Sequence, residues 1–244
     1  QIDFMILEWI QSHLQGAALD LLMPTITALG NGGWLFILLA LVLLLSKRYR
    51  RQGCALAVSL LQERFAQASA FKGEQSVRRW LKQVIAEAND LIFAAASRSA
   101  ARKGMGTTCV GILRSGNRTF SFNVGDSRVY ALYDDGFSCV TQDHSYIADL
   151  LRKGSITAEE AKVHPARNML TNALGVWDRI RIDIDRLKED YQALLVCSDG
   201  LHGYVSEDTI RMVLSEDGHT AEEKARLLVQ LANDMGFNML RKHT

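Results

Sequence analysis

The feature that most restricts how this chain can fold is a long uncharged segment near its amino terminus. No charged residue occurs between Leu21 and Ser46, and residues 33–45 are almost entirely apolar. A helix that spans a bilayer needs about 20 mostly apolar residues. Basic residues follow immediately at positions 47, 48, 50 and 51, and basic clusters of this kind usually lie on the cytoplasmic side. The pattern predicts a membrane-spanning helix over residues 21–45, with the following domain in the cytoplasm.

The residues before this segment favour the same interpretation. Apolar residues recur at helical spacing between Ile2 and Leu21, with polar residues on the other face, as in a helix lying at a membrane surface. We therefore predict an amphipathic helix plus a transmembrane segment in residues 1–61. The alternative is a very apolar helix buried inside a soluble fold, although runs this long without charge are rare in such folds.

Composition narrows the classes of function. The chain has 48% hydrophobic and 23% charged residues, which is typical of a folded protein. Its 28 Lys and Arg residues balance 27 Asp and Glu residues, and no basic stripe is visible, so nucleic acid is excluded as an expected partner. The four cysteines are widely spaced among apolar neighbours, which predicts reduced core thiols: Cys54, Cys109, Cys139 and Cys197.

From Gln62 onward the sequence has the pattern of an α+β domain. Apolar residues at helical spacing predict a helix from Ser76 to Ala96. Strand signals follow at residues 107–113, 119–124, 128–133 and 137–141, and their short connections predict an antiparallel meander. A buried strand is expected at residues 192–197. Four capping residues predict the starts of further helices: Ser145, Thr157, Ser206 and Thr220.

Three spots carry side chains suited to chemistry. Asp126 and Asp199 each follow a strand directly, and each lies beside a glycine. Considered alone, an aspartate at a strand end is usually a turn former or a helix cap. Two such carboxylates in one sandwich could instead converge on Mg²⁺ or Mn²⁺, which prefer oxygen ligands. The third spot contains His144, which, like His164, we interpret as a structural histidine because no second histidine stands at ligand spacing.

Six ordered segments together indicate a family. They are Gly-Met-Gly-Thr-Thr (104–108), Val-Gly-Asp-Ser-Arg (124–128), Thr-Gln-Asp-His-Ser (141–145), the segment 154–160, the segment 164–175, and Leu-Leu-Val-Cys-Ser-Asp-Gly-Leu (194–201). In this order, over residues 63–234, the chain resembles a bacterial member of the protein phosphatase 2C (PPM-type) family. The resemblance implies an α/β/β/α sandwich of two antiparallel sheets, a Mn²⁺ or Mg²⁺ cluster, and phosphoserine or phosphothreonine proteins as substrates, with a cognate Ser/Thr kinase as a further partner.

The resemblance also implies roles for particular residues. Asp199 matches an aspartate of the core metal cluster, and Asp126 matches the ligand of an additional, loosely held metal. No catalytic residue is identified beyond these metal ligands, because in the family a metal-activated water attacks phosphorus directly. Residues 152–167 correspond to a flap beside the cleft, whose candidate substrate contacts are Arg152, Ser155, His164 and Arg167.

The sequence departs from the family pattern at both ends. The family's opening Asn-Glu-Asp and Asp-Gly-Met-Gly-Gly motifs and its closing Gly-Gly-x-Asp-Asn motif have no match here. Residues 1–61 instead resemble, in composition, the amino-terminal part of the type 2 phosphatidic acid phosphatase superfamily, without its catalytic motifs. We therefore expect an incomplete sandwich in residues 62–244, lacking its first and last strands, and an impaired metal-dependent phosphatase. The alternatives are a catalytically dead phosphatase-like binding module, or a fusion fragment without selected function.

Overall fold

The computed structural model describes residues 52–68, 71–98, 102 and 104–241. The predicted amphipathic helix and the predicted membrane span at residues 21–45 lie outside these ranges. Within them, no helix is both long enough and apolar enough to cross a bilayer.

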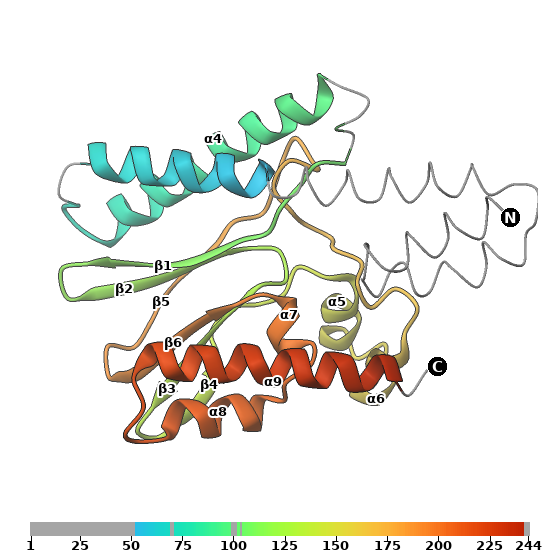
Figure 1. The fold of residues 1–244 in the computed structure, drawn as a ribbon. Helices are drawn as coiled ribbons and strands as arrows, with labels where there is room; N and C mark the ends of the chain where they lie inside the picture. Colours follow the sequence, from blue (N-terminus) through green and yellow to red (C-terminus); the bar gives the residue numbers. More distant parts are fainter. Residues whose placement is uncertain (1–51, 69–70, 99–101, 103, 242–244) are drawn as a thin grey trace, which may run out of the picture.

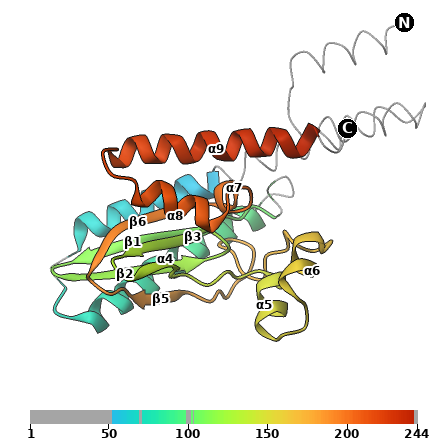
Figure 2. The same cartoon turned by 90° about the horizontal axis from the view of Figure 1, so that it is seen from below.

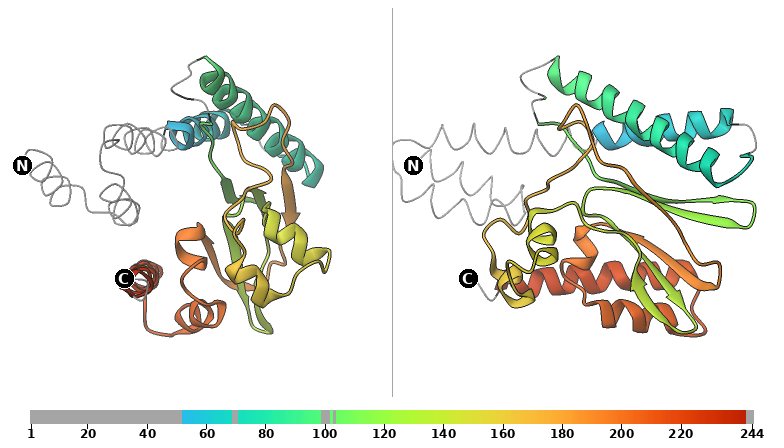
Figure 3. Two further views of the ribbon diagram at one scale, coloured as in Figure 1. Left: turned by 90° about the vertical axis from the view of Figure 1, so that its right-hand side faces the viewer. Right: turned by 180° about the vertical axis from the view of Figure 1, so that it is seen from behind.

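The described residues form four layers (Figures 1 and 2). Two antiparallel three-stranded sheets, in the strand orders β1-β2-β5 and β4-β3-β6, lie between two helical layers. The left view of Figure 3 shows these layers edge-on, with α5 (Tyr146–Arg152) and α6 (Ala158–Val163) at one end of the sheets. This arrangement confirms the expected α+β class with two antiparallel sheets.

The first sheet is covered by α4 (Glu74–Ser97) and by the helix of residues 52–67. The sheet consists of β1 (Cys109–Ser115), β2 (Arg118–Val124) and β5 (Asp183–Arg186). The apolar stripe that predicted α4 is its buried face. Leu81, Ile85 and Ile92 of this face form one core cluster with Phe120 and Val124 of β2.

The second sheet consists of β3 (Arg128–Tyr133), β4 (Gly136–Cys139) and β6 (Tyr191–Cys197). It is covered by α8 (Glu207–Ser215) and α9 (Ala221–Arg241). A second core cluster lies between them and includes Tyr130, Leu132, Ile210, Val213 and Leu228. Each sheet therefore has its own helix-covered core on its outer face.

The predicted helix starts are confirmed at their capping residues. The hydroxyl of Ser145 accepts from the Ala148 N–H at the start of α5 (Tyr146–Arg152), and Thr157 forms a capping box with Glu160 at α6 (Ala158–Val163). Ser206 caps α8, and Thr220 forms the same kind of box with Glu223 before α9.

Three expectations need correction. The four-strand meander is divided, because β1 and β2 pair in one sheet while β3 and β4 pair in the other. The predicted buried strand is instead an edge strand, with Val196 44% exposed. Cys54 is exposed and is not a core thiol, whereas the other three cysteines are half-buried, and all four are free. Burial raises the pKa of the Cys197 thiol to about 11, as expected for an unreactive cysteine.

Candidate metal centre

The turn that carries Asp126 joins the two sheets and is held by a dense set of hydrogen bonds. Gly125 has φ +117°, a backbone conformation that residues with a side chain rarely adopt, and this glycine lets the chain turn away from β2. The Gly125 carbonyl accepts from the His144 N–H at 2.9 Å and from Asn123 Nδ2 at 3.1 Å. Asn123 Nδ2 also donates to the Gln142 carbonyl at 2.9 Å. The backbone just before Asp126 is therefore fixed in one position.

The ring of His144 supports this turn from inside the protein. His144 is only 2% exposed, and its Nδ1 accepts from the Gly125 N–H at 3.2 Å. Nε2 must then carry the proton, which it donates to Asp183 Oδ2 at 2.9 Å, while Arg181 Nη2 donates to the same oxygen at 2.9 Å. Burial raises the pKa of Asp183, but the His144 hydrogen bond and the Arg181 charge outweigh it and hold that pKa below its usual value. These contacts support the structural interpretation of His144.

An ion pair with Arg128 neutralises Asp143, an acidic residue beside the turn. Arg128 binds Asp143 with two parallel hydrogen bonds, Nε to Oδ1 at 2.9 Å and Nη2 to Oδ2 at 2.8 Å. Arg128 Nη1 also donates to the Tyr130 hydroxyl, which donates to Glu207 Oε1 on α8 at 3.1 Å. Burial lowers the pKa of Arg128, but the hydrogen bonds to Asp143 and its negative charge outweigh burial. The pKa of Arg128 therefore lies above its ordinary value. Arg128 therefore remains charged at every working pH.

The strand register brings Asp199 to the same end of the second sheet. Arg128 of β3 pairs antiparallel with Cys197 of β6. Asp126 precedes Arg128 by two positions and Asp199 follows Cys197 by two, so both aspartates emerge at the same edge. Asp199 begins the short helix α7 (Asp199–His202). The pairing of β3 with β6 is therefore the physical reason why Asp126 and Asp199 lie at the same edge of the sheet.

The two carboxylates are close enough for their charges to interact. The pKa of Asp126 is raised first by burial and then by the negative charges of Asp199 and Asp143, which outweigh the lowering effects of a backbone hydrogen bond and of His202. Within the described residues, neither Asp126 nor Asp199 forms an ion pair with Lys or Arg. Asp199 is exposed and Asp126 is half-buried. The pair is therefore an uncompensated negative site that is open to solvent.

The chemistry of this site fits one hydrated divalent cation. Carboxylate oxygens are the ligands that Mg²⁺ and Mn²⁺ prefer, and such ions commonly keep several waters. A second cation would need more ligands, and the described part of the chain gathers no group of three His, Cys, Asp or Glu side chains that could hold a metal. Asp126 and Asp199 by themselves therefore do not make a two-metal cluster.

The four substrate-binding candidates of the flap form their hydrogen bonds and ion pairs with residues other than Asp126 and Asp199. Arg152 pairs with Asp149 at 2.9 Å, His164 Nδ1 accepts from the Ala166 N–H, and Arg167 donates to the Lys162 carbonyl. The Ser155 N–H donates to the Leu150 carbonyl. These four residues are thus bonded to the flap itself or to the preceding helix α5, and a role in substrate binding stays a prediction.

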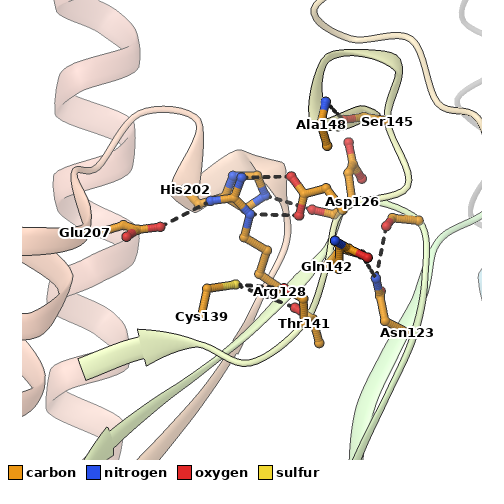
Figure 4. A network of polar contacts seen from close by, with 12 residues as sticks. Asn123, Asp126, Arg128, Cys139, Thr141, Gln142, Ser145, Ala148, His202 and Glu207 are labelled. Atoms are coloured by element: carbon orange, nitrogen blue, oxygen red, sulfur yellow. Dashed lines mark hydrogen bonds and ion pairs between the residues drawn. The ribbon is translucent and has the colours of Figure 1, made fainter. Parts of the chain in front are cut away.

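Sequence reasoning missed the residue that connects the two aspartates. His202 Nε2 contacts the main-chain carbonyl of Asp126 at 2.9 Å (Figure 4). The only available signal was its position three residues after Asp199, which would place both on one face of a helix. Sequence reasoning also missed the one-turn helix α7 and the strand β5, which is defined by its pairing with the distant β2.

Comparison with known proteins identifies the family. The protein phosphatase 2C model matches residues 45–235. The serine/threonine phosphatase stp of Listeria innocua is 35% identical over 182 residues, which are 74% of this chain and 72% of that protein. Protein phosphatase PhpP of Streptococcus pneumoniae is 34% identical over 161 residues, 66% of this chain and 65% of that protein. The chain belongs to the protein phosphatase 2C family, and its class is that of a serine/threonine phosphatase, a hydrolase.

Solved structures support the same assignment. Crystal structures of Stp1 from Staphylococcus aureus and of the PstP catalytic domain in complex with two manganese ions superpose with TM-scores of 0.68 and 0.64. The first is 36% identical and covers 75% of this chain and 71% of that one, and the second is 28% identical and covers 76% of each. The family match begins at residue 45, and the domain boundary at residues 61 and 62 stays a prediction.

Proposed function

We propose that this chain dephosphorylates phosphoserine and phosphothreonine proteins by using Mn²⁺ or Mg²⁺ held at Asp126 and Asp199. Its natural partners would then be phosphoproteins and a cognate Ser/Thr kinase. The observation that carries the proposal is the Arg128–Cys197 register, which places the two aspartates at one sheet edge. The raised pKa of Asp126, caused first by burial and then by the charges of Asp199 and Asp143, supports it, because a bound dication would favour the charged form of this carboxyl.

The residues of this chain would act mainly by holding a cation and by fixing the carboxylates that bind it. A bound cation would supply a water of lowered pKa for attack on phosphorus. Asp126 and Asp199 would hold the cation, and the Gly125 contacts would fix the direction of Asp126. The Arg128–Asp143 ion pair would partly offset the charge of Asp143, which adds to the repulsion at Asp126.

We expect turnover to be Mn²⁺-dependent but slow. A single ion held by two carboxylates cannot stabilise both the attacking and the leaving oxygen, and loss of that clamp is worth several kcal/mol. The full chain should therefore hydrolyse para-nitrophenyl phosphate and a phosphothreonine peptide roughly 10²-fold or more below the Listeria innocua stp protein. Chelation with EDTA should remove the activity.

The assay distinguishes the two outcomes that matter. Turnover equal to that of the Listeria protein would show that further ligands complete the site and would contradict the impairment. Phosphopeptide binding without any turnover would instead favour a phosphatase-like binding module, as the small number of carboxylates would allow.

We also propose that residues 21–45 attach the chain to a membrane, with the phosphatase domain in the cytoplasm. The support is the uncharged run followed by four basic residues. Membranes from cells expressing the full chain should retain it after carbonate extraction. Release of the chain into the supernatant would refute attachment by a spanning helix.

A further inference from the structure

We propose that His202 is a positioning residue that sets the separation of Asp126 and Asp199 through its hydrogen bond to the Asp126 carbonyl. The inference rests on the proposed metal function, because its consequence is the affinity of this pair for a divalent cation. It concerns this hydrogen bond alone and assigns His202 no contact with the metal or the substrate.

The first argument is the geometry of the contact. His202 Nε2 lies 2.9 Å from the main-chain oxygen of Asp126. A carbonyl oxygen can only accept, so Nε2 carries the proton and donates it. His202 is half-buried and Asp126 is half-buried, so the bond is partly shielded from competing water. Figure 4 shows the two residues approaching each other from α7 and from the turn after β2.

The second argument is that this hydrogen bond connects the two backbone segments that carry Asp126 and Asp199. His202 ends the four-residue helix that Asp199 begins. The Gly203 N–H closes this turn on the Asp199 carbonyl at 2.9 Å, and a Cβ at Gly203 would lie 2.7 Å from that oxygen, so the turn is tight. Fixing His202 against Asp126 therefore also fixes the backbone of Asp199. One side chain connects the two segments that carry the acidic pair.

The third argument is that two consecutive carbonyls of the turn are held by different elements. The Gly125 carbonyl accepts hydrogen bonds from Asn123 of β2 and from the N–H of His144, which lies two residues before α5. The Asp126 carbonyl is bound by His202 from α7. Without His202 the Asp126 carbonyl would lose this partner, and the peptide after Asp126 could rotate between the fixed Gly125 and the strand pairing that begins at Arg128.

The fourth argument is electrostatic. The charges of Asp126 and Asp199 repel each other, and in the part of the chain that the structure describes neither has a Lys or Arg partner. A contact that holds the two segments together before a cation binds reduces the ordering that binding must impose. Removing it should therefore weaken cation binding more than it weakens the fold.

The test compares three variants of the full chain: His202→Ala, His202→Gln and His202→Asn. The Nε2 of glutamine can occupy the place of the imidazole Nε2, whereas the shorter asparagine places its nitrogen near the position of Nδ1. Calorimetric Mn²⁺ titration should show about tenfold weaker binding for the Ala and Asn variants, the equivalent of one hydrogen bond. The Gln variant should remain within about threefold of the parent. His219→Ala, which removes an exposed histidine between α8 and α9, should bind as the parent does.

Two further readouts separate positioning from catalysis and from general stability. At saturating Mn²⁺ the Ala variant should recover most of the parental kcat, because the defect lies in metal affinity. In the metal-free protein, amide hydrogen exchange at residues 126 and 127 should be about fivefold faster in the Ala variant. Exchange within β1 and β2 should be unchanged.

Each outcome decides the proposal. Unchanged Mn²⁺ affinity and unchanged exchange in His202→Ala would overturn it, and so would a Gln variant as weak as the Asn variant. If the parent itself binds no Mn²⁺, the proposed function fails, while the exchange measurement still decides whether His202 fixes the turn. If the parent binds Mn²⁺ and the variants do not differ from it, only the role of His202 fails.

Discussion

Replacing Asp199 with asparagine should strongly weaken Mn²⁺ binding and reduce Mn²⁺-dependent hydrolysis. Asparagine keeps the size of the side chain at the start of α7 but removes one of the two carboxylates at the site. A cation held by a single carboxylate would be bound at least about tenfold more weakly, and turnover at a fixed low Mn²⁺ concentration should fall below detection. The measurement is Mn²⁺ titration together with para-nitrophenyl phosphate turnover over a range of Mn²⁺ concentrations.

The same variant separates metal loss from misfolding. The Asp199 charge is one cause of the raised pKa of Asp126. A carboxyl whose pKa is raised in the folded state is disfavoured as the charged form, so it reduces stability as the pH rises through the shifted value. Removing Asp199 should reduce this penalty, and the metal-free variant should unfold at a temperature no lower than that of the parent.

Asp217→Asn provides the matched control for Asp199→Asn. Asp217 is an exposed aspartate in the connection between α8 and α9, away from the acidic pair. It should retain Mn²⁺ binding and turnover. Hydrolysis by Asp199→Asn at the parental rate would contradict the assignment of the metal site.

Replacing Gly125 with alanine should destabilise the protein and also disable the site. At φ +117° an L side chain is strained, and the new Cβ would lie 2.4 Å from Thr108 Cγ2 and 3.2 Å from Thr108 Cα. Backbone strain and overpacking each cost about 1–3 kcal/mol, so we expect a loss of about 3 kcal/mol. For a chain of this length that corresponds to a fall of roughly 10 °C in Tm, measurable by thermal unfolding.

The functional consequence of the Gly125 variant should exceed its stability cost. The peptide that must shift carries the carbonyl bound by His144 and Asn123, and it precedes Asp126 directly. Mn²⁺ binding should therefore be lost even at temperatures where the variant is folded. Gly136→Ala is the control, because that position has an ordinary φ and no heavy atom within 4 Å of the new Cβ. Equal Tm values for the two glycine variants would contradict the role of Gly125.

The sequence by itself determined the local elements of this protein. The apolar stripe of α4 and the capping boxes at Thr157 and Thr220 were predicted correctly, because helical periodicity and caps depend on residues three or four positions apart. The positions of the other strands, β5 excepted, were also predicted, since alternation and short turns are local as well. The six ordered motifs further indicated the family that comparison then showed.

Only the tertiary structure decided how these elements meet. The sequence predicted one meander, but packing against two separate helical layers divides it at Gly125. The four-residue β5 is defined by its pairing with β2, 60 or more positions away, which no local pattern encodes. The juxtaposition of Asp126 and Asp199 depends on the β3–β6 register, and the contact of His202 depends on that juxtaposition. Local preferences act over a few residues, whereas strand pairing across long connections is selected by burial of both cores at once.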